Sequence, residues 1–346
     1  MPDKLLVTSS PHLRTRNDTA QLMRDVIVAL IPALIAAVWV FGFRALVMTI
    51  VSAGACVFFE WGYRKLLKKS NDVTDYSAIV TGILIAFCVP VTLSVWMLIV
   101  GDFFAIVLVK QLFGGIGKNF MNPALAARAF LFSWPQSMNN WAAPKWYPNF
   151  FSLSTADAVT GATPLSFIGQ GVLPESSSLF DVIIGNIGGS MGEISAIALI
   201  IGAGYLLWRR IIDWRVPASY LGTVAVITFL LPIGGLARAD SVFWNLFSGG
   251  LILGAFFMAT DYTTSPVNPA AKIIYGIGCG VITVAIRAKG GYPEGVTYGI
   301  LVMNAVSALL DRYFPRKRFG ETVRKFSVNF SGIAELKSAV KKILSN

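Results

Sequence analysis

Long apolar tracts decide what this chain can fold into. A helix that crosses a lipid bilayer needs about 20 consecutive, mostly apolar residues, and the sequence carries ten tracts of about this length. Hydrophobic residues make up 55% of the chain and charged residues only 14%, and the mean hydropathy is +0.65, which is outside the range of soluble globular domains. The tracts are apolar on every face, so we expect an all-α integral membrane protein with about ten transmembrane helices. The expected helices lie near residues 24–43, 45–63, 76–94, 96–113, 120–134, 190–208, 216–234, 242–260, 268–287 and 294–314.

The net charge of +11 fits a membrane topology better than binding to nucleic acid. If the N-terminus is cytoplasmic, ten crossings place most of the 29 Lys and Arg residues on the cytoplasmic side. This asymmetry is the positive-inside pattern of membrane proteins. We therefore expect both termini in the cytoplasm, with the lipid bilayer and no nucleic acid among the partners.

An internal repeat divides the chain. The strings "GGIGKNFMNPALAARAF" (114–130) and "MATDYTTSPVNPAAKIIYG" (258–276) both interrupt an apolar tract with a polar turn that ends in Asn-Pro-Ala. Matching interruptions in two halves indicate a site built from broken helices; the simpler interpretation is that Asn-Pro begins two ordinary helices. The predicted segments are an N-terminal segment 1–23, a five-helix repeat 24–134, an extracytoplasmic loop 135–189, a second five-helix repeat 190–314 and a basic tail 315–346.

The cysteines and the histidine argue against a metal centre. Cys56, Cys88 and Cys279 each stand alone in an apolar tract, and the only histidine is His12. Neither an iron–sulfur cluster nor a zinc site has such spacing. We expect no metal site, so a redox centre held by this chain alone would be organic.

The predicted loop 135–189 contains the polar string "DAVTGATPL" from Asp157 to Leu165. Judged locally, Thr163 before Pro164 is a helix N-cap followed by proline at the first helical position. Gly161 supplies the backbone freedom for a tight turn.

The same string, Asp157-x-x-Thr160-Gly161-Ala162-Thr163, resembles the flavinylation motif of membrane redox complexes, in which the last threonine carries FMN through a phosphoester bond. Five further blocks resemble the D subunits of Rnf complexes, the ion-translocating ferredoxin:NAD oxidoreductases, and more distantly the B subunit of the sodium-pumping NADH:quinone oxidoreductase. These blocks are "SSPH", "FGGIGKNFMNPALAARAFLF", "DVIIGNIGGSMGEISAIALIIGA", "FFMATDYTTSPVN" and "YPEGVTYGILVMNAVSALLD".

The resemblance implies a function for the whole chain. It implies a urea-transporter-like membrane fold in the bacterial cytoplasmic (inner) membrane, with the flavin loop outside the cytoplasm. The chain would be an electron carrier in a redox-driven translocase, with covalent FMN on Thr163 attached by a flavin transferase. Its partners would be the other membrane and peripheral Rnf subunits, where ferredoxin and NAD react, so the isolated chain would not catalyse the overall reaction.

The resemblance also implies roles for polar residues in the membrane. Glu60 and Asp261 match acidic positions linked to cation movement, and Asp102 and Glu193 are further candidates for an Na⁺ or H⁺ pathway. A carboxylate near a helix end can instead reach water. Asn119 and Asn122 resemble positions near a non-covalent riboflavin, although a polar helix break would have the same residues.

Two other classes of function remain open at this stage. Duplicated halves with broken helices are typical of a channel or permease for a small solute, which would need no flavin. A purely structural anchor would make Thr163 dispensable.

Overall fold

Every regular element that the structure describes is a helix. The computed structural model describes residues 18–68, 75–144, 150–153, 163–169, 179–289 and 294–314. The first half contains α1 (Thr19–Phe41), α2 (Phe43–Leu66), α3 (Ser77–Phe87), α4 (Val95–Phe103), the π-helix η2 (Phe104–Gln111), α5 (Pro123–Leu131) and α6 (Pro135–Met138). The second contains α7 (Pro164–Gly169), α8 (Leu179–Ile184), α9 (Ala196–Trp208), α10 (Arg215–Leu230), the 3-10 helix η3 (Ile233–Gly235), α11 (Arg238–Phe247), α12 (Leu251–Leu253), the π-helix η4 (Gly254–Met258), α13 (Pro269–Lys289) and α14 (Val296–Tyr313). The expected all-α class is confirmed.

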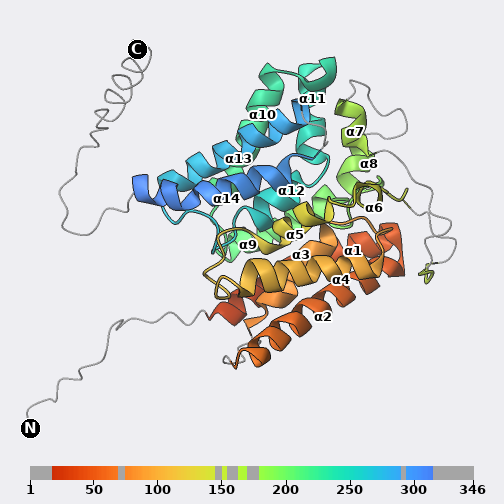
Figure 1. Cartoon of the computed structure of the whole chain (residues 1–346). Coiled ribbons are helices and arrows are strands. Elements are labelled where there is room, and N and C mark those ends of the chain that lie inside the picture. Colours follow the sequence, from red (N-terminus) through yellow and green to blue (C-terminus); the bar gives the residue numbers. More distant parts are fainter. Residues whose placement is uncertain are drawn as a thin grey trace, which may run out of the picture.

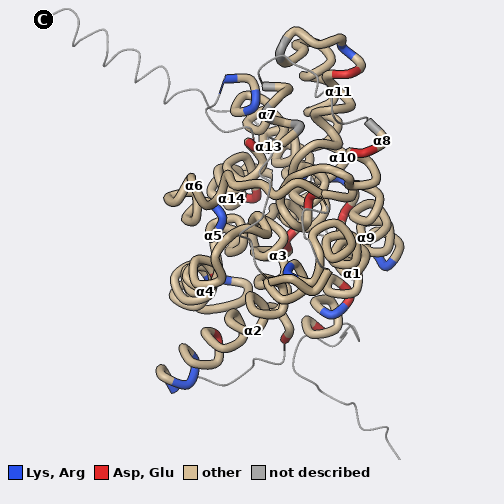
Figure 2. The backbone as a smooth tube through the Cα atoms, turned by 90° about the vertical axis from the view of Figure 1, so that its right-hand side faces the viewer, with Lys and Arg blue, Asp and Glu red and all other residues tan. Residues whose placement is uncertain are grey.

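The outer surface of the bundle is apolar. Large side chains such as Ile35 and Trp39 of α1, Ile50 of α2 and Leu230 of α10 are more than half exposed. Water would penalise such a surface, whereas lipid would not. Charged positions are sparse along the chain, and some of them lie inside the bundle (Figure 2). This is the arrangement of a multi-pass membrane protein.

Fewer helices than predicted are long enough to cross a membrane. In the described ranges α1, α2 and α13 pass by length and composition, and a fourth span results if α11 and Leu251–Met258, which are bent by 62°, count as one. The remaining predicted tracts also contain helices, but α3 has 11 residues, α5 has 9 and α9 has 13. The number of crossings therefore stays a prediction.

Unwound backbone replaces the missing helical turns and is paired inside the protein. The segments after α3 and before α9 meet, because the amide of Gly192 donates to the Phe87 carbonyl at 2.9 Å and that of Met191 donates to the Val89 carbonyl at 3.2 Å. A Cβ at Gly192 would lie 2.3 Å from the Cβ of Phe87, so only glycine fits there. Pairing of this kind lets irregular backbone exist at membrane depth.

The two interruptions seen in the sequence have the same local structure. Each follows a π-helix, η2 or η4, and each ends at an Asn-Pro that starts a helix, α5 or α13. Asn122 caps α5 by accepting from the amides of Ala124 and Leu125 at 3.0 and 3.3 Å. Its Nδ2 also donates to the carbonyl of Met258, the last residue of η4, at 3.3 Å. The two interruptions are therefore in contact.

The helices also show two opposite sides of the molecule. In Figure 1 the beginning of α1 and the end of α14 lie toward the left, whereas α6, α7 and α8 lie toward the right. The N-terminal end of α1 and the C-terminal end of α14 thus lie on the side of the molecule away from Thr163, which directly precedes α7.

Candidate functional site

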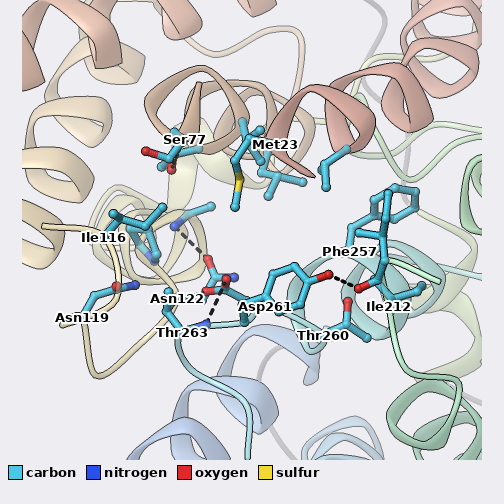
Figure 3. Close-up of a pocket in the computed structure, with 18 of the residues that line it drawn as sticks. Met23, Ser77, Ile116, Asn119, Asn122, Ile212, Phe257, Thr260, Asp261 and Thr263 are labelled. Carbon is cyan, nitrogen blue, oxygen red and sulfur yellow. Dashed lines mark hydrogen bonds between the residues drawn. The ribbon is translucent and has the colours of Figure 1, made fainter. Parts of the chain in front are cut away.

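A cavity lies where the two interruptions meet (Figure 3). It encloses about 90 Å³, room for several water molecules. Asn119 and Asn122 line it from the first interruption and Asp261 from the second. The structure thus brings together three residues that the sequence singled out. The wall also includes Met23, Ser77, Thr81, Lys110, Ile212, Phe256, Phe257, Thr260 and Thr263.

The polar groups of this cavity are only partly satisfied within the described residues. The Oδ1 atom of Asn119 has no hydrogen-bond partner there, and its Nδ2 donates to the Met121 carbonyl at 3.3 Å. Asp261 accepts from the hydroxyls of Thr263 at 2.9 Å and Thr264 at 3.2 Å. One unpaired amide oxygen beside an apolar wall suits a flat ligand with a polar edge, but a space of about 90 Å³ holds only water-sized guests.

A buried ion cluster adjoins the cavity. Glu60 of α2 is fully buried and accepts from Lys110 Nζ at 2.8 Å, Gln111 Nε2 at 2.7 Å and Arg64 Nη2 at 3.0 Å. Lys110 also donates to the Ser77 hydroxyl at 2.6 Å and lines the cavity. Glu60 therefore does not reach water, which excludes the simpler interpretation of this carboxylate. Charged side chains that pair with one another inside a membrane protein in this way are candidates for ion handling.

Asp102 lies apart from that cluster and is also fully buried. The Ser52 hydroxyl donates to its Oδ1 at 2.7 Å, while its Oδ2 has no hydrogen-bond partner among the described residues. No cation of the described part pairs with it. A half-satisfied buried carboxyl group is costly, which keeps Asp102 a candidate for proton or cation handling.

A second ion cluster gathers around Arg128 of α5. Arg128 Nη1 donates to Glu193 at 2.9 Å, and Nη2 donates to the Ser190 hydroxyl at 3.3 Å and to Glu294. All three charged side chains are at most one-tenth exposed. A Cβ at Gly250 would lie 2.4 Å from Glu193 Oε1, so glycine allows this carboxylate to approach the chain. Glu193 was expected as a site residue; Arg128 and Glu294 were not.

Thr163 packs against this second cluster. It is 8% exposed and lines a hollow of about 10 Å³ together with Glu193 and Glu294. Helix α7 begins at the next residue, Pro164, as the local sequence predicted. The hollow has no room for a phosphate, so a phosphoester requires the Thr163 hydroxyl to turn away from it. Asp157, Thr160, Gly161 and Ala162, the rest of the predicted motif, lie outside the described residues.

The fold and these clusters define the class of protein: a multi-pass helical membrane protein with buried, interacting charges at a helix break. The chain belongs to the family described as NQR2, RnfD, RnfE, whose model matches residues 6–320.

Several curated relatives align with nearly the whole chain. It is 46% identical over 321 residues to the D subunit of the Na(+)-translocating ferredoxin:NAD(+) oxidoreductase complex of Acetobacterium woodii, covering 92% of this chain and 96% of that protein. It is 39% identical over 329 residues to the proton-translocating counterpart of Clostridium ljungdahlii, covering 91% and 96%. The D subunit of the ion-translocating oxidoreductase complex of Actinobacillus succinogenes is 32% identical over 339 residues, with 89% and 95% covered.

Proposed function

We propose that this chain is the membrane electron-carrier subunit of an ion-translocating ferredoxin:NAD oxidoreductase complex and holds FMN covalently on Thr163. The observation that carries the proposal is the match over 92% of the chain to a D subunit of such a complex. Ferredoxin and NAD would react on other subunits, and a flavin transferase would attach the FMN. The complex, not the isolated chain, would catalyse the overall reaction.

The residues around Thr163 support an attachment site at a buried electrostatic centre. FMN, when attached, would supply reversible electron uptake. The threonine hydroxyl would hold the phosphate, and Pro164 would fix the start of α7 and so the position of the threonine backbone. Behind it, Arg128 places a positive charge between Glu193 and Glu294. Because Arg128 pairs with both carboxylates, a flavin that gains negative charge at Thr163 would not lie next to an unpaired buried carboxylate.

For translocation of Na⁺ or H⁺, the proposed residues are Glu60, Asp102, Glu193 and Asp261. Support comes from the burial of Glu60 beside Lys110. Lys110 in turn lines the same cavity as Asp261. A cation or proton entering the cavity could compete with Lys110 for Glu60 or bind to Asp261 directly. Asp102 and Glu193 would act farther from that cavity.

A non-covalent riboflavin at Asn119 and Asn122 is a separate part of the proposal. The polar edge and apolar wall suit its ring, and the free Oδ1 of Asn119 is an unused acceptor. The enclosed space of about 90 Å³ requires side chains to move before a ring enters. We therefore assign no step to this group.

The proposed location is the bacterial cytoplasmic membrane, with cytoplasmic termini and the flavin loop on the outer side. Support comes from the positive-inside pattern and from the opposite placement of the α1 and α14 ends and of α6 to α8 (Figure 1). The urea-transporter-like repeat of five helices per half belongs to the same proposal, supported by the matching π-helices η2 and η4.

In-gel flavin fluorescence of the denatured protein tests the central claim. The chain is expressed with its flavin transferase as wild type, Thr163→Val and Thr160→Val, and the modified peptide is mapped by mass spectrometry. We expect a fluorescent wild-type band, loss of fluorescence in Thr163→Val, and FMN mapped to Thr163 wherever it is present. A dark wild-type band, with the transferase active on a second substrate, would instead favour a permease or a structural anchor.

A further inference from the structure

A second and larger cavity opens at the end of α9, where α9, α10 and α13 come together. It measures about 640 Å³. Three cationic side chains, Arg210, Arg215 and Lys272, line it together with a single carboxylate, Asp213. Asp213 accepts from Arg215 Nη1 at 3.0 Å and from Lys272 Nζ at 3.1 Å. Three positive charges and one negative charge leave the wall with an excess of positive charge.

Arg210 is the cation of this wall that does not pair with Asp213. Its side chain has no hydrogen bond or ion pair within the described part of the chain. Its neighbour Arg209, in contrast, pairs with Asp25 at 3.1 Å. Arg210 is therefore available to an anion in the cavity.

The backbone at Arg210 is one that normally selects glycine. Helix α9 ends with the amide of Arg210 donating to the Leu207 carbonyl at 3.0 Å and the amide of Ile211 donating to the Leu206 carbonyl at 2.9 Å. This pair of bonds is a Schellman motif, whose left-handed position usually holds glycine. Arg210 has φ +56° there. A non-glycine residue that keeps this strained backbone beside a cavity is a candidate for a functional role of its side chain.

The rest of the wall matches a membrane–water interface. Trp214 and Tyr262 line the cavity and are 63% and 50% exposed, and Val267 beside them is 63% exposed. Trp208, in the last turn of α9, is 78% exposed. Exposed tryptophan and tyrosine concentrate at the depth of the lipid headgroups. Cations, aromatic rings and apolar side chains thus meet in one opening.

We propose that this cavity binds the headgroup of an anionic phospholipid. The phosphate would lie against Arg210 and the outer faces of Arg215 and Lys272, while Trp214 and Val267 face the start of the acyl chains. Basic pockets between membrane helices bind anionic headgroups in this way. The site is independent of any flavin on Thr163 and of the side of the membrane that it faces.

Native mass spectrometry of the assembled complex tests the proposal. Complexes in mild detergent receive phosphatidylglycerol, phosphatidylcholine or inorganic phosphate, and the fraction of the released chain that carries one ligand is measured. In wild type we expect retention of phosphatidylglycerol over phosphatidylcholine. In Arg210→Gly we expect retention to fall about fivefold, the equivalent of about 1 kcal/mol for one basic residue at a lipid surface.

Arg210→Gly separates binding from folding. Glycine relaxes the left-handed backbone, so the variant should melt no lower than wild type while it loses the lipid. The matched control is Arg238→Gln, which removes an exposed arginine beyond the opposite end of α10 and should retain the lipid.

Three outcomes would overturn the proposal. One is equal retention in wild type and Arg210→Gly. Another is equal loss in Arg238→Gln, which would mean unspecific charge attraction. The third is stoichiometric retention of inorganic phosphate without lipid, which would make the site one for a free anion.

Discussion

At the scale of single residues, the buried arginine of α5 has the clearest energetic role. Arg128 contacts Glu193 and Glu294, which lie 65 and 166 positions away in the sequence. An arginine in an apolar tract is visible in the sequence, but its partners are not, because nothing local relates residues so far apart. The family resemblance indicated Glu193, but nothing in the sequence placed Arg128 or Glu294 beside it.

Removing this guanidinium should destabilise the protein strongly. Arg128→Gln leaves two carboxylates buried without a cation, and breaking a buried pair in this way typically costs about 3–5 kcal/mol. We expect a large drop in the melting temperature of the purified complex. Arg312→Gln, at an exposed arginine in the last turn of α14, is the control and should change stability by less than about 0.5 kcal/mol. Equal melting temperatures would show that the two glutamates do not need the charge.

Asp213, between α9 and α10, predicts a pH dependence. Partial burial acts to raise its pKa, but hydrogen bonds from the Arg215 amide and the Lys272 ammonium outweigh it and leave the pKa below the ordinary value. A folded-state pKa below the unfolded one gives stability that is present above about pH 3.9 and is lost as the pH falls through the folded pKa. Asp213→Asn should make the melting temperature depend less on pH in this acidic range. Lys272→Met should move the acid transition to higher pH, and a wild-type curve without such a transition would refute the assignment.

At the scale of elements, close packing of α1 on α9 depends on glycine. A Cβ at Gly202 would lie 2.0 Å from the backbone oxygen of Ala29, whereas one at Gly204, on the same helix, would meet nothing within 4 Å. Gly202→Ala must push α9 away from α1 and should cost about 1–3 kcal/mol. Gly204→Ala should instead be neutral or stabilising by up to about 1 kcal/mol through helix propensity. Melting temperatures of the two variants decide this, and equal values would contradict the packing.

Where the helices lie could be predicted from the sequence, but how they end could not. Apolar tracts predicted α1, α2 and α13 closely because hydrophobic length is a local property. The shortness of α3 and α9 depends on the contact between Phe87 and Gly192, which pairs backbone that is distant in sequence. The π-helices before Asn122 and Asn268 have no local signature either, although the Asn-Pro repeat marked their positions.

At the scale of the whole molecule, α2 is long enough to cross the membrane. Its 24 residues span about 36 Å, more than the hydrocarbon core. At its N-terminal end the amide of Phe43 donates to the Phe150 carbonyl at 2.9 Å, and Arg44 contacts the Leu153 carbonyl, so residues 150–153 lie at that end. Leu67 lies just past the other end. If α2 crosses the bilayer, as its length and composition predict, Leu153 and Leu67 lie on opposite sides of it.

This geometry turns the proposed orientation into a labelling experiment. Leu153 and Leu67 are 49% and 48% exposed, so single cysteines there should react equally well once reagent reaches them. The natural cysteines, Cys56, Cys88 and Cys279, are all buried and give little background. With a membrane-impermeant maleimide on intact cells, we expect Leu153→Cys to be labelled and Leu67→Cys to be labelled only after the membrane is opened. The reverse pattern would place the predicted loop 135–189, and Thr163 with it, in the cytoplasm, where an electron carrier would serve the opposite face of the membrane.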